Sequence, residues 1–210
     1  MLAAALGAAC TREEAPAAAA PLAASAPANA AADTSGGRLR AVSADGQWVV
    51  EVRPTPGILV ETAYGEAEAT ELWLMRADGG AARMLLRGRA GDAPERTLST
   101  FQHPALSPDG REVYFLSNEA WVTSAAVHAV DVETGRERYV CPGNSLHVVP
   151  RGPYAGHLVV SQHRYWEGGG SYDWPWLVTP QGRALRPILR DEATDAQLDS
   201  ALAALEAGRG

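Results

Sequence analysis

The segment of the sequence best suited to recognition is a run of aromatic and acidic residues around three consecutive glycines, between positions 164 and 176. It contains three of the six tryptophans in the chain. Such aromatic side chains anchor protein interfaces, and the neighbouring carboxylates add charge and hydrogen-bond acceptors. The same side chains could receive a sugar ring, so a carbohydrate or other small ligand is the alternative. The candidate partner-binding residues of this segment are Tyr165, Trp166, Glu167, Tyr172 and Asp173.

No residue pattern in the sequence predicts catalysis or metal binding. Residues 168–172 only superficially resemble the Gly-x-Ser-x-Gly turn of hydrolases, and no α/β-hydrolase domain follows them. Asp45, Asp78 and Asp109 lie next to turn glycines, but they lack the alternating carboxylates that give calcium its six or more oxygen ligands. We therefore assign no catalytic residue, metal or cofactor. A binding module is expected rather than an enzyme, and a hydrolase is the least favoured alternative.

Charge and composition narrow the choice of partner. The net charge is −7 and the pI is about 5.2, and no cluster of lysines or arginines is present. Because contact with phosphates requires concentrated positive charge, nucleic acid is not an expected partner. Hydrophobic residues make up 46% of the chain and charged residues 20%, which is typical of a globular protein.

The first ten residues are small and apolar and end at Cys10, which resembles the end of a bacterial lipoprotein signal. Residues 11–37 are rich in Ala and Pro and predict a disordered tether. Together they predict lipidation of Cys10 and a periplasmic protein anchored to a membrane by its lipid. An Asp directly after the lipidated cysteine marks retention at the inner membrane in enteric lipoproteins. Because this position is Thr11, the outer membrane is preferred. The alternative is an Ala-rich N-terminus with a chance cysteine. The other cysteine, Cys141, is expected to be a buried, inert thiol.

Three repeats are visible from their turns. In each repeat, one glycine-bearing turn precedes a β-rich run, and a second glycine turn separates two further strands. With the strand before the first turn, each repeat holds four antiparallel strands, which is the blade of a β-propeller. The first repeat carries an insertion from Thr55 to Thr70. The paired turn glycines are Gly46 and Gly79, Gly110 and Gly135, and Gly156 and Gly182. The sequence therefore predicts an all-β domain over residues 38–189, with blades at about 38–87, 98–141 and 144–189.

The second repeat carries the clearest family signal. The Ser107-Pro-Asp-Gly110 turn, its flanking strands and the later Val130-Asp-Val-Glu-Thr-Gly135 segment resemble the repeat of TolB-type propellers. A similar repeat occurs in the propeller domains of prolyl-oligopeptidase-family enzymes. The first repeat keeps Ser-x-Asp-Gly, whereas the third has lost the Asp. The resemblance implies a propeller-like fold and leaves the function open, because such folds host many unrelated roles.

Three blades are fewer than the four to eight of a closed propeller. The chain could form an open arc capped by other elements, or two copies could pair as a homodimer to complete a six-bladed ring. The third alternative is a twisted β-sandwich. One cap is expected from residues 190–210, where a capping box at Thr194 and Gln197 precedes Leu198, Leu202 and Leu205 on one helical face. The sequence thus predicts a short C-terminal amphipathic helix packed on the β domain.

In a propeller, the loops between the second and third strands of every blade open on the same face. The first blade would add Tyr64, Glu66, Glu68 and Glu71 to the aromatic segment of the third blade, and the second would add Asn118, Glu119 and Trp121. This combined aromatic and acidic face predicts a protein–protein binding module. We expect an envelope lipoprotein that acts as a scaffold or as an inhibitor or immunity-type protein, with another envelope protein as its partner.

Overall fold

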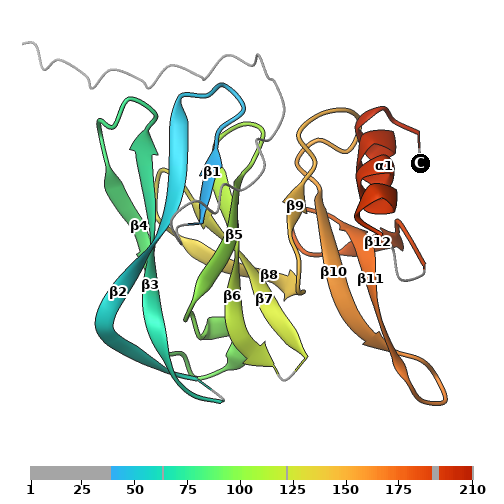
Figure 1. Ribbon diagram of the computed structural model, residues 1–210, viewed down its shortest axis with the longest axis horizontal. Coiled ribbons are helices and arrows are strands. Elements are labelled where there is room, and N and C mark those ends of the chain that lie inside the picture. The colour runs from blue at the N-terminus through green and yellow to red at the C-terminus, as the bar shows by residue number, and fades with distance from the viewer. Residues whose placement is uncertain (1–38, 63, 122, 191–193, 210) are drawn as a thin grey trace, which may run out of the picture.

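The computed structural model describes residues 39–62, 64–121, 123–190 and 194–209, without the side chains of residues 118–120. The predictions for residues 1–10 and 11–37, including lipidation of Cys10, fall outside these ranges. Within them the chain forms three four-stranded antiparallel sheets and one C-terminal helix (Figure 1). The predicted all-β, blade-like fold class is therefore confirmed.

Each sheet is a meander whose strands follow one another in sequence order. Blade 1 consists of β1 (Arg40–Val42), β2 (Trp48–Thr62), β3 (Gly65–Arg76) and β4 (Arg83–Arg87). Blade 2 consists of β5 (Phe101–Leu106), β6 (Glu112–Trp121), β7 (Ser124–Asp131) and β8 (Glu137–Pro142). Blade 3 consists of β9 (His147–Val148), β10 (Leu158–Tyr165), β11 (Ser171–Val178) and β12 (Ala184–Pro187). A short 3₁₀ helix, η2 (Pro94–Arg96), lies on the connection between blades 1 and 2. Because the sheets are three separate meanders, the two-sheet sandwich is wrong.

The repeated Ser-x-Asp-Gly turns fold in the same way in blades 1 and 2. In blade 2 the Ser107 hydroxyl donates to Asp109 Oδ1 at 2.6 Å and accepts from the Glu112 N–H at 2.9 Å. The corresponding distances around Ser43 in blade 1 are 2.5 and 2.9 Å. All six turn glycines named above have positive φ, between 69° and 90°. Since only glycine adopts this backbone region without strain, the repeated glycines in the sequence follow from the backbone conformation that these turns require.

The hydrophobic core lies between the blades. Alternate residues of β6 face opposite ways: Val113 and Phe115 pack against blade 1, and Tyr114 and Leu116 pack against blade 3. All four are at most 1% exposed. A strand buried on both faces is expected to be apolar at every position, which explains why β6 shows little hydrophobic alternation in the sequence. The first strands of neighbouring blades, β1 with β5 and β5 with β9, also contact each other, as the inner strands of a propeller do.

The far face of blade 3 is covered by α1 (Asp195–Glu206). The predicted capping box is present, since Thr194 accepts from the Gln197 N–H and the Gln197 side chain accepts from the Thr194 N–H. Leu205 is 2% exposed and packs with Val159 and Leu177 of blade 3, and Leu198 and Leu202 border the same cluster. The helix therefore occupies the face on which a fourth blade would stack.

The far face of blade 1 is stabilised by charged and aromatic side chains. The Arg53 guanidinium lies 4.6 Å from the centre of the Trp73 ring, and the Trp73 indole donates to Glu71 at 2.7 Å. Arg87 forms an ion pair with the same carboxylate at 2.5 Å. A polar outer face is typical of the terminal unit in a stack of repeats. Both ends of the arc thus differ from an inner blade surface, and completion of a ring by a homodimer stays a prediction.

Candidate interaction surface

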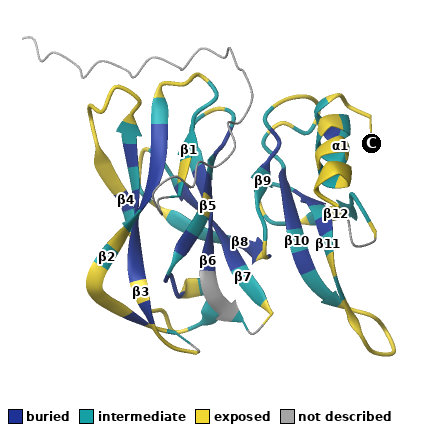
Figure 2. Ribbon diagram, viewed as in Figure 1, coloured by how far each residue is buried: buried dark blue, intermediate teal, exposed yellow. Residues whose placement is uncertain are grey.

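The second and third strands of each blade form a hairpin, and the three hairpins point to the same side of the molecule. In Figure 1 their turns lie at the bottom, opposite the Asp-Gly turns at the top. Figure 2 shows the outer parts of the β2–β3 and β10–β11 hairpins as exposed, while the strand centres are buried. Of the seven large apolar side chains that are exposed among the described residues, five lie on these two hairpins, namely Ile58, Leu59, Tyr64, Tyr165 and Trp166. We call these two outer parts, residues 57–68 and 163–174, the prongs.

The prong of blade 1 is a continuation of β2 and β3, where the sequence predicted an insertion. The ladder shifts register between Pro54 and Leu59 and then resumes to the turn. At the turn the Thr62 hydroxyl donates to the Gly65 carbonyl at 2.7 Å and accepts from the Tyr64 N–H at 3.2 Å. These bonds fix the turn while Leu59 and Tyr64 are each 52% exposed. The prong is therefore an ordered structure that presents apolar side chains to solvent.

The charges of this prong have one sign. Leu59 pairs with Glu68 and Glu61 pairs with Glu66 across the ladder, and all four residues are exposed. The residues between them, Val60 and Ala67, are buried on the other side of the hairpin. Partners in a ladder lie on the same face of the sheet, so the outer side of the prong combines a leucine with three glutamates.

The prong of blade 3 is an aromatic cluster. The centre of the Trp166 ring lies 4.4 Å from that of Tyr172 and 5.2 Å from that of Trp174. The ring centres of Tyr172 and Trp174 are 4.2 Å apart. Trp166 is still 49% exposed and Tyr165 is 70% exposed. The contacts with Tyr172 and Trp174 hold the Trp166 indole in place on the hairpin while about half of its surface stays exposed to solvent.

The two faces of this prong carry different polar contacts. On one face His163 Nδ1 lies 3.1 Å from the exposed Asp173 carboxylate, and the His163 ring contacts Tyr165 at 5.0 Å. On the other face the Arg164 guanidinium lies 3.6 Å from the centre of the Trp176 ring. Trp176 borders the core between blades 2 and 3, and it belongs to the interior rather than to the surface.

The contribution of blade 2 and of Glu71 differs from the expectation. Trp121 is half-buried and lies 6.1 Å from the Tyr139 ring, and the side chain of Glu119 is among those not described. Glu71 is on the far face of blade 1, where Trp73 and Arg87 engage its carboxylate, and these hydrogen bonds lower its pKa against the effect of burial. The placement of Glu71 at the loop face was therefore wrong. Glu167, Tyr64, Tyr165 and Trp166 are all exposed at the prongs.

Neither a candidate metal site nor a candidate membrane-spanning helix is present in the described part of the chain. Within it no group of His, Cys, Asp and Glu side chains could hold a metal ion. No helix in the same residues has the length and apolar character needed to cross a membrane. Cys141 is a free, buried thiol, and burial raises its pKa to about 11, which keeps it protonated and inert as expected.

No protein-family profile and no curated protein matches the chain. The fold is similar to the β-propeller domain of the trilobed protease from Pyrococcus furiosus, at 12% identity and a TM-score of 0.44 over 70% of this chain and 40% of that one. It is also similar to TolB from Acinetobacter baumannii, at 16% identity and a TM-score of 0.42 over 71% of this chain and 32% of that one. A third similar structure is dipeptidyl peptidase 4 from Porphyromonas gingivalis, at 12% identity and a TM-score of 0.45 over 71% of this chain and 24% of that one.

The chain thus spans less than half the length of each of these three proteins. The architecture itself is defined by the chain's own sheets: three consecutive four-stranded meanders stacked face to face, with their first strands in contact. These features make it a partial, propeller-like arc of three blades.

Proposed function

We propose that this protein is a protein-binding module of the cell envelope, and that it holds a basic partner surface between its two prongs. The observation that carries the proposal is the concentration of exposed apolar side chains on residues 57–68 and 163–174. Exposed apolar side chains that cluster instead of being scattered mark interaction sites. Tyr and Trp are also the residues most often found at the energetic centre of protein interfaces.

The spacing of the prongs favours a protein over a sugar. They belong to blades 1 and 3, with blade 2 between them (Figure 1). Only a partner with an extended surface can contact both at once. A sugar would need an open aromatic face, and mutual packing of Trp166, Tyr172 and Trp174, at centroid distances of 4.2 to 5.2 Å, covers part of each of these three rings.

The charges of the prongs favour a basic partner. Residues 57–68 contain Glu61, Glu66 and Glu68 and no lysine or arginine. Residues 163–174 contain two carboxylates, Glu167 and Asp173, and one arginine, Arg164, whose guanidinium is stacked on the Trp176 ring. Complementary potentials increase the rate of association and suppress wrong partners. A surface rich in lysine or arginine with an apolar centre would fit both the charges and the exposed rings.

Addition of a partner strand to the edge of β11 is the less favoured mode of binding. The outer strand β12 pairs with β11 only from Trp176 onward, which leaves the edge of residues 171–174 without a neighbouring strand among the described residues. Asp173 places a charge on this part, and Pro175 lacks an N–H at its end. Charges and prolines at a strand edge oppose strand addition. Side-chain contacts therefore carry the proposed recognition.

The proposed location rests on the N-terminal sequence. Lipidation at Cys10 followed by the Ala- and Pro-rich residues 11–37 would tether the β domain to a membrane facing the periplasm. The test is to replace Cys10 with Ala in the natural gene and to follow partition into detergent and incorporation of labelled fatty acid. Loss of both in the variant would support the anchor, and unchanged partition would contradict it.

The binding proposal is tested by photo-crosslinking from both prongs. A photoreactive residue is placed at Leu59 or at Tyr165, with Thr134 as the control because it is exposed on a turn of the opposite end. We expect one protein to be crosslinked from both prongs and not from Thr134, and the yield to fall as salt is raised. Crosslinking of unrelated proteins from the two prongs, or retention of glycan in their place, would contradict the proposal.

A further inference from the structure

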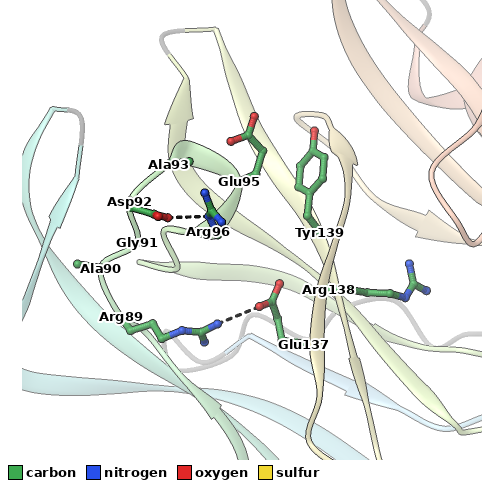
Figure 3. Close-up of a pocket in the computed structure, with 10 residues that line it drawn as sticks. All are labelled: Arg89, Ala90, Gly91, Asp92, Ala93, Glu95, Arg96, Glu137, Arg138 and Tyr139. Atoms are coloured by element: carbon green, nitrogen blue, oxygen red, sulfur yellow. Dashed lines mark hydrogen bonds and ion pairs between the residues drawn. The ribbon is translucent and has the colours of Figure 1, made fainter.

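A cleft lies between the blade 1–2 connection and β8. Residues 89–96 form one wall and residues 137–139 form the other (Figure 3). The cleft has a volume of about 600 Å³. Cavities that hold small ligands commonly measure about 300 to 1,000 Å³. The small residues Ala90, Gly91 and Ala93 leave the space open, so the charged side chains and Tyr139 decide what it can hold.

Four of the charged side chains in the cleft are already paired. Glu137 uses one carboxylate oxygen for His128 Nδ1 at 2.7 Å and the other for Arg89 at 2.9 Å. Burial would raise the pKa of the Glu137 carboxyl, but the bonds to His128 and Arg89 outweigh it and hold the pKa below its ordinary value. At the rim, Arg96 pairs with Asp92 at 2.6 Å. These pairs neutralise one another and leave no spare positive charge for an anion.

Arg138 is also engaged elsewhere. Its side chain points out of the cleft in Figure 3. It donates three hydrogen bonds to the Glu112 carboxylate, at 2.7, 2.9 and 3.1 Å, and one to the Pro180 carbonyl at 2.9 Å.

The groups left over are the carboxylate of Glu95 and the hydroxyl of Tyr139. Among the described residues, no hydrogen bond or ion pair engages either group. The two lie at the same end of the cleft in Figure 3, and the Glu95 charge contributes, after burial and Cys141, to raising the pKa of Tyr139. The Tyr139 ring makes edge-to-face contacts with Trp121 and His128, with centroid distances of 6.1 and 5.7 Å. Glu95 is half-buried.

We propose that the cleft binds an alkylammonium group, with Glu95 as the acceptor and Tyr139 as the aromatic wall. A carboxylate forms charge-assisted hydrogen bonds with an ammonium, and an aromatic ring face attracts the same cation. The paired arginines would repel a cation only weakly, because each already faces a carboxylate. The ammonium could belong to a free amine or to a lysine side chain of a partner.

The test is titration of the full chain with n-butylammonium, followed by the amide NMR signals of Gly91 and Tyr139. n-Butanol, which has the same shape without the charge, is the ligand control. Glu95→Gln keeps the size of the side chain and removes its charge, and Glu167→Gln makes the same change on the prong of blade 3. We expect Glu95→Gln to weaken binding at least about tenfold, as loss of a charged hydrogen-bond partner does. Glu167→Gln should leave it unchanged.

A second variant and a second ligand complete the test. Tyr139→Leu should also weaken binding, with the unfolding temperature measured in parallel to verify the fold. Nα-acetyl-lysine methylamide distinguishes the two sources: if it binds as butylammonium does, a partner's lysine fits, and if only butylammonium binds, the ligand is a free amine. Equal binding of butanol, no shift with butylammonium, or an unchanged affinity in Glu95→Gln would overturn the proposal.

Discussion

Glu61 and Glu66 lie directly opposite each other across the β2–β3 ladder, two carboxylates on the exposed side of one hairpin. Like charges in this relationship destabilise a sheet. Leu59 and Glu68 form the neighbouring pair on the same side. A pair that lowers the stability of the free protein is consistent with a role in the proposed complex, in which a cation of the partner would lie between the two carboxylates.

Replacing Glu61 with Lys should therefore have two opposite effects. It converts the repulsive pair into an attractive one and should raise the free energy of unfolding by about 0.2–1 kcal/mol. It should also weaken partner binding, because it places a positive charge against a basic surface. Chemical denaturation and the yield of the Tyr165 crosslink measure the two effects. Glu133→Lys, the same charge change on an exposed turn at the opposite end, is the control and should leave binding intact.

Trp166 and Trp176 should separate binding from stability. Trp166→Ala removes a ring that is 49% exposed, and we expect a loss of affinity of at least about tenfold with an unfolding free energy changed by about 1 kcal/mol or less. Trp176→Ala removes a ring at the core between blades 2 and 3 and should cost about 3 kcal/mol or more. If Trp166→Ala destabilises the protein as strongly as Trp176→Ala, Trp166 has a structural role and not a recognition role.

Much of the fold could be predicted from the sequence because its signals are local. The Ser-x-Asp-Gly turn is closed by hydrogen bonds between residues two to five positions apart, such as Ser107 with Asp109 and Glu112. The cap of α1 joins Thr194 to Gln197, three positions away. Patterns of this length are fixed by residue type alone, and they located both the blades and the helix.

The site was harder to predict because its contacts join distant positions. Arg89 and Glu137 are 48 residues apart and meet only because blade 2 packs on the end of blade 1. Likewise, the sequence placed Glu71 next to Glu68 near a loop, but the alternation of β3 turns its side chain to the far face of blade 1. The sequence did indicate which residue types would line the prongs. Whether these side chains are exposed depends on how far the outer strands β4 and β12 pair along β3 and β11.

His147 should make stability depend on pH. It lies on β9, its Nε2 is buried without a hydrogen-bond partner, and burial lowers its pKa below the ordinary 6.5 despite Glu206 and Asp199 of α1. The native state then binds fewer protons than the unfolded state, so stability is fully present above pH 6.5 and is lost as the pH falls below it.

The measurement is the unfolding temperature between pH 7.5 and 5, compared with His147→Gln. That variant should show a smaller fall over this range. His103→Gln changes a histidine that is exposed on β5 and should behave as the wild type does. The same fall in the wild type and in His147→Gln would assign the pH dependence to other groups.

Leu205 should be the most sensitive position of the C-terminal helix. Its side chain is 2% exposed and packs on Val159 and Leu177, so Leu205→Ala should lower the free energy of unfolding by about 2–4 kcal/mol. Ser200→Ala, on the exposed side of the same helix, should change it by less than about 0.5 kcal/mol. Urea denaturation measures both, and equal effects would mean that α1 does not cover blade 3 in solution.

The packing of blade 2 on both sides has a consequence for how the protein opens. Blade 2 shares one apolar cluster with blade 1 and another with blade 3. Blades 1 and 3 each share an apolar cluster with blade 2 alone among the blades. In stacked repeats, stability is roughly the sum of each unit and its neighbouring interfaces. The middle blade should therefore exchange its amide hydrogens last and the outer blades first. Both prongs belong to outer blades, so each can loosen and adapt to a partner while the centre of the arc stays folded.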